Sequence, residues 1–133
     1  MTPEQQQTAK QCLEGADGGT MTFPQIVGAL IEAGFDGYLV DFRSAQNTYY
    51  DAAGEGLVLP THTSTVMVAA AFDQATVQAA IRDAQAQVAG YTYRSFCDQV
   101  RRAGCAGYLV SFTGRRVLYF GRTGETHVEH FPR

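Results

Sequence analysis

The stretch GETHVEHF near the C-terminus carries two glutamates and two histidines within six residues. Imidazole and carboxylate groups are zinc ligands, so a metal site is the first hypothesis for this stretch. If it is a β-strand, Glu125, His127 and Glu129 share one face and His130 lies on the other. Two histidines on opposite faces cannot bind the same ion unless the strand is bulged, and we therefore expect no metal site.

The preceding stretch, GRTGE at residues 121–125, resembles a phosphate-binding loop because glycines let backbone amides turn toward an anion and Arg122 adds positive charge. It lacks the GxxxxGK[ST] pattern, and a strand rather than a helix is expected after it. We interpret it as a hairpin turn.

The cysteines offer a nucleophile but no recognisable catalytic motif. Cys12, Cys97 and Cys105 have no CxxC spacing, and no local signature surrounds them or the three histidines. Free cysteine usually behaves as a small buried hydrophobic residue. We expect buried thiols, no disulfide framework, no cofactor and no enzymatic activity.

Two arginines lie close in sequence to aromatic residues. Arg115 and Arg116 precede Tyr119 and Phe120, an arrangement found in sheets that bind single-stranded nucleic acid. The net charge of the chain is −3, which argues against a nucleic-acid partner for the protein as a whole. A weak single-stranded nucleic-acid binder therefore stays as an alternative only.

Four tyrosines recur at a fixed spacing of 70 residues, Tyr38 with Tyr108 and Tyr49 with Tyr119. An aromatic ring with a hydroxyl suits a ligand cleft or an interface, because one end is apolar and the other forms hydrogen bonds. The alternative is a core position with a satisfied hydroxyl.

The tyrosines belong to a longer repeat. Residues 22–60 and 92–130 align without a gap and are identical at twelve positions, including the GYLV runs that begin at Gly37 and Gly107. Chance would give only about two or three identities at ordinary amino-acid usage. The sequence therefore predicts two related halves, about 1–60 and 72–133, joined by residues 61–71.

Each half has the pattern of two helices followed by three strands. Thr22 and Thr92 are typical N-caps, and Gly34 and Gly104 are typical helix ends. An earlier helix is predicted from Thr2 to a stop at Gly15. The corresponding helix of the second half is predicted to start near residue 73.

The runs GYLVDF and GYLVSF alternate, as half-buried strands do, and two shorter runs follow each of them. The joining segment THTSTVMVAAAF is predicted to be linker with a candidate extra strand. The predicted fold is a single α+β domain, 1–133, a tandem pseudo-symmetric repeat with helices packed on one face of an antiparallel sheet.

The two halves differ in charge. Residues 1–66 contain two basic and eight acidic side chains, whereas residues 67–133 contain eight basic and five acidic ones. Opposite charges suggest halves that attract each other, within one chain or between two chains. Independent drift of two solvated surfaces is the alternative.

The combination TYRSFC, AGCAGYLVSF and VLYFGRTGETHVEHFP, with YYDAAGEGLVLP in the first half, resembles the YdfO-like family of small bacterial and prophage-borne proteins. The resemblance covers most of the chain, although the shared pattern is mostly aromatic, glycine and apolar scaffold. It implies a compact α+β fold, a cytoplasmic setting and an association with prophages. It implies no catalytic residue.

These observations predict a non-enzymatic cytoplasmic protein that acts by binding a protein partner or a second copy of itself. The candidate ligand or interface residues are Tyr38, Tyr49, Tyr108, Tyr119, Arg115 and Arg116. No apolar run has the ~20 residues of a membrane-spanning helix, and no secretory signal is recognised. The main alternative is a protein that binds a small ligand in a tyrosine-lined cleft between the halves.

Overall fold

A computed structural model describes residues 1–132; Arg133, the last residue of the predicted domain, lies outside them. The described chain is an α+β fold with four helices and six antiparallel strands. The first half contains α1 (Pro3–Gly18), α2 (Phe23–Glu32), β1 (Phe35–Asp41), β2 (Gln46–Asp51) and β3 (Gly56–Pro60). The second contains α3 (Gln74–Ala86), α4 (Tyr93–Arg102), β4 (Cys105–Ser111), β5 (Arg116–Gly121) and β6 (Thr126–His130).

The six strands form one sheet in the order β3-β2-β1-β4-β5-β6. Each half contributes a three-stranded meander, and β1 pairs with β4 at the centre, where Leu39 lies opposite Leu109. The sheet is therefore continuous across the two halves, and its two edge strands are the last strands of each half.

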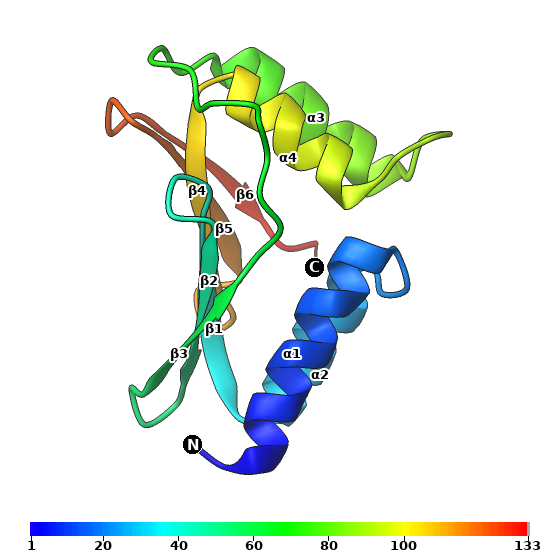
Figure 1. The fold of residues 1–133 in the computed structure, drawn as a ribbon, viewed down its shortest axis with the longest axis vertical. Coiled ribbons are helices and arrows are strands. Elements are labelled where there is room, and N and C mark those ends of the chain that lie inside the picture. The colour runs from blue at the N-terminus through cyan, green and yellow to red at the C-terminus, as the bar shows by residue number, and fades with distance from the viewer. Residues whose placement is uncertain (133) are drawn as a thin grey trace.

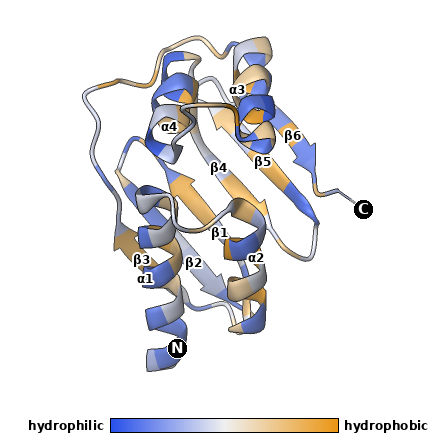
Figure 2. Ribbon diagram, turned by 90° about the vertical axis from the view of Figure 1, so that its right-hand side faces the viewer, coloured by the Kyte–Doolittle hydropathy of each residue, from blue (hydrophilic) through white to orange (hydrophobic). Residues whose placement is uncertain are grey.

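All four helices lie on one face of this sheet (Figure 1), and they form two pairs, α1 with α2 and α3 with α4. The alternation predicted for the first strands is confirmed: Tyr38 and Val40 are buried beneath the helices, whereas Leu39 is only half-buried on the opposite face. Figure 2 shows the more hydrophobic strands of the sheet behind the two helix pairs.

The predicted helix caps are confirmed. Thr22 accepts a hydrogen bond from the backbone of Gln25, and the Gln25 side chain completes a capping box. Thr92 caps α4 in the same way without the return bond, because Ser95 is too short to make it. Asp73 caps α3.

The predicted stop of the first helix at Gly15 is wrong. Helix α1 continues to Gly18 and ends at Gly19, whose φ of 72° is left-handed. Gly15 is a packing position instead, since a Cβ there would lie 2.6 Å from the side chain of Met21. A glycine required by a distant contact has the same appearance in sequence as a helix-ending glycine.

The candidate extra strand in residues 61–72 is also wrong, because no strand occurs there. This segment crosses from β3 to α3 and is held by single hydrogen bonds. The amide of Ala69 donates to the carbonyl of Arg101, and Arg122 donates to the carbonyl of Val68. A strand would need a continuous ladder of such bonds with one neighbour.

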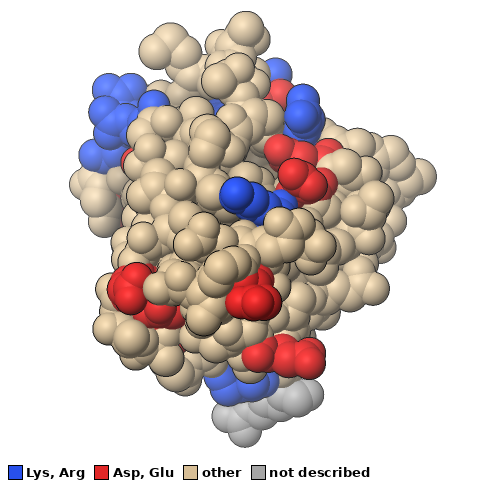
Figure 3. Space-filling model, turned by 60° about the horizontal axis from the view of Figure 1, so that its bottom comes forward, with Lys and Arg blue, Asp and Glu red and all other residues tan. Residues whose placement is uncertain are grey.

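Acidic and basic side chains are scattered among uncharged residues on the face that Figure 3 presents. Within residues 1–132, no ion pair links an arginine or lysine of one half to an acid of the other. The attraction expected between the halves is thus not realised as Arg or Lys ion pairs among the residues that the structure describes. No helix in the described residues is long and apolar enough to cross a membrane.

Candidate functional site

A cavity of about 790 Å³ lies between the two helix pairs and the sheet. All four helices contribute to its walls, for example through Cys12, Ile26, Ile81 and Phe96. Its floor is the helix-facing side of β1, β2, β4 and β5, which lies behind the two helix pairs in Figure 2. The cavity therefore lies where the two halves of the chain meet.

Tyrosine dominates the lining of this cavity, which contains six of the seven tyrosines of the chain. The four predicted from the sequence lie on the floor, where Tyr38 is directly opposite Tyr49 and Tyr108 is opposite Tyr119. The ring centroids are 5.3 Å apart in each pair. The structure thus brings the four predicted tyrosines together in one site.

Two further tyrosines, Tyr91 and Tyr93, line the cavity from the start of α4. The hydroxyls of Tyr93 and Tyr108 are 2.6 Å apart and share a hydrogen bond across the cavity wall. Sequence reasoning missed both residues. Phe23 and Tyr93 are both aromatic and lie 70 residues apart, at the same offset as the other tyrosine pairs. This recurrence is the sequence pattern from which Tyr93 could have been predicted.

Burial makes these hydroxyls hard to ionise. It raises the pKa of Tyr49 to about 12, and it places the pKa values of Tyr38, Tyr93 and Tyr108 well above the ordinary tyrosine value. The pKa of Tyr119 is also raised, first by burial and then by the nearby Cys105. At neutral pH the floor therefore presents neutral phenols that both donate and accept hydrogen bonds.

One polar group in the floor has no partner. Asn47 is only 4% exposed and lines the cavity, and its amide nitrogen donates to the hydroxyl of Tyr49 at 3.1 Å. Its Oδ1 atom is buried and accepts no hydrogen bond from residues 1–132. Such an acceptor costs about 1–3 kcal/mol when left unpaired, so it is a place where a ligand donor is favoured.

A hydrogen-bonded chain flanks the second half of the cavity. The side-chain amide of Gln74 donates a hydrogen bond to Nδ1 of His127, so Nε2 is the ring nitrogen that carries the proton. Nε2 lies 2.8 Å from a carboxylate oxygen of Glu129. Glu129 also accepts from Arg82. Partial burial acts to raise the pKa of Glu129, but these two hydrogen bonds outweigh it and the pKa lies below the ordinary value.

On the side of the first half, His62 of the linker lies 2.9 Å from Asp17 at the end of α1. The imidazole also packs edge-on against the ring of Tyr93, with centroids 6.5 Å apart. Nε2 of His62 is buried and unpaired among the described residues, yet His62 does not line the cavity. The pair fixes the linker against α1 and supports the wall formed by Tyr93.

The two predicted arginines lie outside the cavity. Arg115 has a left-handed φ of 52° in the β4–β5 turn, and its guanidinium donates to the carbonyl of Pro132 and lies over the ring of Phe131. Arg116 is exposed at the start of β5. Arg115 therefore holds the chain that follows β6.

That following chain closes one side of the cavity. Phe131 of the second half packs edge-on against Phe23 of α2, with ring centroids 5.9 Å apart, and both residues line the cavity. This contact is a side-chain bridge between the halves on the helix side of the sheet.

The three cysteines are buried, as predicted. Burial raises the pKa of Cys97 to about 12 and that of Cys105 to about 11, so both are protonated thiols at neutral pH. A protonated, buried thiol is a poor nucleophile and a poor metal ligand. In the described residues, no group of three His, Cys, Asp or Glu side chains is arranged to hold a metal ion.

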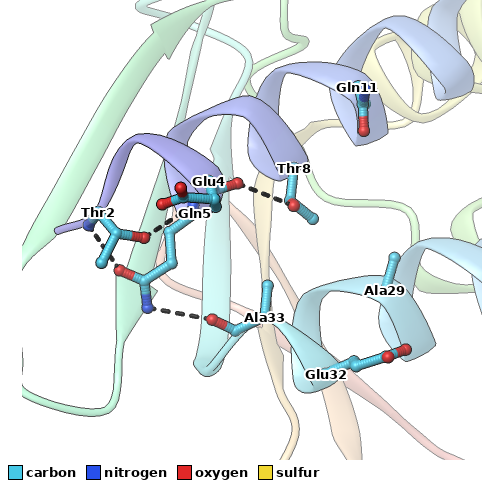
Figure 4. Close-up of a pocket in the computed structure, with 8 residues that line it drawn as sticks. All are labelled: Thr2, Glu4, Gln5, Thr8, Gln11, Ala29, Glu32 and Ala33. Carbon is cyan, nitrogen blue, oxygen red and sulfur yellow. Dashed lines mark hydrogen bonds between the residues drawn. The ribbon is translucent and has the colours of Figure 1, made fainter.

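A second, more open depression lies between α1 and α2 (Figure 4). Three of its polar side chains have partners in the fold: Thr2 and Gln5 form the capping box of α1, Gln5 also donates to the carbonyl of Ala33, and Thr8 donates to the carbonyl of Glu4. This depression is explained by helix capping and by the tie between the two helices.

Comparison of the sequence with models of known protein families and with curated proteins returned no match.

Proposed function

We propose that the protein binds a small, uncharged and largely aromatic or apolar molecule in the cavity between the helix pairs, and that this molecule donates a hydrogen bond. The observation that carries the proposal is the unpaired, buried Oδ1 of Asn47 in the floor of a tyrosine-lined cavity. A donor on the ligand would satisfy this acceptor.

The size of the cavity agrees with this class of ligand. Its volume of about 790 Å³ falls within the range of about 300–1,000 Å³ that is typical of small-molecule sites. Tyrosine rings bind flat aromatic groups by offset stacking and by edge-to-face contact, and their hydroxyls add directional hydrogen bonds. An aromatic ligand would therefore find complementary surfaces on the floor and on the α4 wall.

The charges around the cavity argue against an ionic ligand. No lysine or arginine is among its lining residues within residues 1–132, so a phosphate or carboxylate would lose its hydration without gaining a cation. The lining carboxylates Asp17 and Glu129 already have partners, His62 and Arg82 respectively, and do not favour a ligand cation.

We attribute the cavity to a tandem pseudo-symmetric repeat. Support comes from the strand registers, in which Tyr38 opposite Tyr49 corresponds to Tyr108 opposite Tyr119 at an offset of 70 residues. The repeat is broken at one floor position, where Asn47 corresponds to Val117. This break gives the cavity one polar end and fixes the direction in which a ligand with one donor would bind.

The first test blocks the cavity. Ala84→Phe places a phenyl ring in its wall, whereas Ala86→Phe adds the same ring at an exposed position of α3 that does not line it. In a titration with 1-naphthol followed by fluorescence, we expect Ala84→Phe to bind at least about tenfold more weakly than the wild type and Ala86→Phe to bind equally well. Equal binding by Ala84→Phe would contradict the proposal.

The second test removes the unpaired acceptor. Asn47→Val introduces the residue that the second half has at the corresponding position, Val117. The wild type should prefer 1-naphthol to 1-methoxynaphthalene by about tenfold, the equivalent of one hydrogen bond, and Asn47→Val should lose this preference. Thr48→Val, on the opposite face of the same strand, should keep this preference.

Native mass spectrometry of the purified protein would reveal any ligand that is retained from the cell.

The remaining predictions from the sequence complete this proposal. A YdfO-like relationship and a cytoplasmic setting are compatible with a non-enzymatic binding protein of this size. Nucleic-acid binding has less support, because Arg115 is engaged with Phe131 and Pro132. Protein interaction, the first expectation from the sequence, has less support than ligand binding, because the four tyrosines expected at an interface are buried in the cavity floor.

A further inference from the structure

Asn47 and Tyr49 together leave two hydrogen-bonding positions unused at one end of the cavity floor. The amide nitrogen of Asn47 donates to the hydroxyl of Tyr49 at 3.1 Å, so the hydroxyl oxygen is the acceptor in this bond and its own proton stays available. Among the residues that the structure describes, the Tyr49 hydroxyl makes no other hydrogen bond. Oδ1 of Asn47 also lacks a partner there. The pair therefore presents a hydrogen-bond acceptor and a hydrogen-bond donor close together.

The packing of Tyr49 fixes the position of its hydroxyl. The ring stacks on Tyr38, with centroids 5.3 Å apart and ring planes 28° apart, and it meets Phe35 edge-on at 6.3 Å. Tyr49 is 2% exposed and Asn47 is 4% exposed. Burial raises the pKa of Tyr49 to about 12, so the hydroxyl keeps its proton at neutral pH. Both side chains are thus held in place before a ligand arrives, which lowers the entropic cost of binding.

We propose that the ligand is a flat aromatic lactam, whose N–H donates to Oδ1 of Asn47 and whose neighbouring C=O accepts from the hydroxyl of Tyr49. This inference rests on the proposed function and narrows its ligand class. A lactam is uncharged, in agreement with the absence of lysine and arginine from the cavity lining within residues 1–132. An aromatic N–H without a carbonyl beside it would satisfy Asn47 but leave the Tyr49 proton unpaired. A carbonyl without an N–H would do the opposite.

The second half of the chain does not repeat this donor–acceptor pair. Tyr119 corresponds to Tyr49, but Val117 corresponds to Asn47. Val117 and Tyr119 also line the cavity, and a valine side chain can neither donate nor accept a hydrogen bond. The lactam edge of the ligand is therefore bound at the first-half end of the floor, and the rest of the aromatic system lies toward Tyr119.

Three bicyclic compounds of similar size test this pairing: oxindole has both groups, indole has only the N–H, and 1-methyloxindole has only the C=O. Their affinities are measured by displacement of 1-naphthol, followed by fluorescence. We expect the wild type to bind oxindole about tenfold more tightly than 1-methyloxindole. In Tyr49→Phe, the ratio of oxindole affinity to indole affinity should fall by about tenfold. Tyr50→Phe, the same change at a neighbouring tyrosine that does not line the cavity, should keep the wild-type ratio.

The outcomes separate this inference from the proposed function. An unchanged ratio in Tyr49→Phe, or tighter binding of 1-methyloxindole than of oxindole, would overturn the lactam inference. A wild type that binds 1-naphthol but does not distinguish oxindole from 1-methyloxindole would also overturn the lactam inference and leave the proposed function intact. A wild type that binds none of the four compounds would contradict both.

Asn47 also allows a direct measurement on the wild type, because it is the only asparagine of the chain. Protein labelled with nitrogen-15 in the asparagine side-chain amide gives one pair of amide proton resonances, from Asn47 alone. We expect saturating oxindole to shift this pair and 1-methyloxindole to shift it much less. The absence of a shift with oxindole would overturn the inference, and this measurement does not depend on the stability of Tyr49→Phe.

Discussion

Tyr119 illustrates what burial in the cavity floor does to a single side chain. Its ring packs against Tyr108 on the neighbouring strand and against the imidazole of His127, and it is 8% exposed. Burial removes the water that would stabilise a phenolate and is the first cause of the raised pKa of Tyr119. Folding therefore favours the protonated phenol strongly, and the same holds for the other tyrosines of the floor and of α4.

We expect the protein to unfold cooperatively just above pH 10. Six tyrosines have raised pKa values in the folded chain: Tyr91, and five whose hydroxyls are more deeply buried, Tyr38, Tyr49, Tyr93, Tyr108 and Tyr119. A raised pKa contributes stability that is fully present below the unfolded value of about 10 and is lost as the pH rises toward the folded value. In that window each of these tyrosines lowers the free energy of unfolding by about 1.4 kcal/mol per pH unit, so the five most buried ones together lower it by about 7 kcal/mol per pH unit. Tyrosinate absorbance and far-UV circular dichroism should therefore change together.

Tyr119→Phe provides the control for this pH dependence. It removes one ionisable group with little change in volume. As the pH rises above about 10, the variant should therefore lose about 1.4 kcal/mol less stability per pH unit than the wild type loses. Separate absorbance and unfolding transitions in the wild type would show that the tyrosines are accessible in the folded protein.

The 70-residue offset in the sequence singles out the four tyrosines that lie on the cavity floor, but no sequence pattern singles out Asn47. An asparagine in a strand is informative only when its partners are known, and its unpaired Oδ1 depends on the packing of residues far apart in the chain. Arg115 and Arg116 do not line the cavity, for a related reason. Nearness to Tyr119 in sequence did not place them in the same site, since the turn directs Arg115 toward the chain after β6.

At the scale of elements, patterns carried by a few consecutive residues predicted the helices and strands well. Features that depend on contacts between residues far apart in the chain were not predicted. N-caps, helix-ending glycines and strand alternation depend on a few consecutive residues, and they were correct at Thr22, Asp73 and Gly34. Arg101 had no such signal. Its counterpart in the first half is the exposed Ile31, yet Arg101 is 3% exposed, lies over the ring of Phe42 and is paired with Asp98.

Gly34 and Gly104 provide a matched pair for the next prediction. Both follow a helix with φ near 90°, so an alanine at either position meets the same backbone strain of about 1–2 kcal/mol. The surroundings differ, because a Cβ at Gly34 approaches only the end of the flexible Gln5 side chain, at 3.2 Å. At Gly104 it would lie 1.9 Å from the carbonyl oxygen of Ala71.

We therefore expect Gly104→Ala to destabilise the protein by at least about 2 kcal/mol more than Gly34→Ala, since the linker must move away from α4 and β4. Urea denaturation of both variants provides the comparison. Equal losses of stability would show that the linker yields easily and that its packing contributes little.

At the scale of the whole molecule, the central pairing of β1 with β4 joins the two halves of the chain into one sheet. A three-stranded meander with two short helices buries little apolar surface alone, and each half would expose the unpaired edge of its first strand. The joined sheet removes both edges and places two helix pairs side by side. The tyrosine-lined cavity between the helix pairs follows from this single pairing.

This dependence predicts how the separated halves behave. A fragment of residues 1–66 retains β1–β3 and both helices but loses the β4 partner of Leu39 and the ring of Phe131 that packs on Phe23. We expect neither this fragment nor residues 67–133 to give a dispersed amide spectrum as a monomer, and we expect a mixture of the two to recover the spectrum of the intact protein. The opposite charges of the fragments should favour their association over self-association, so recovery should weaken as salt is raised from 0.05 to 0.5 M, by about tenfold in apparent affinity. A cooperatively folded monomer of either fragment would contradict the dependence, because each half would then be a domain in its own right.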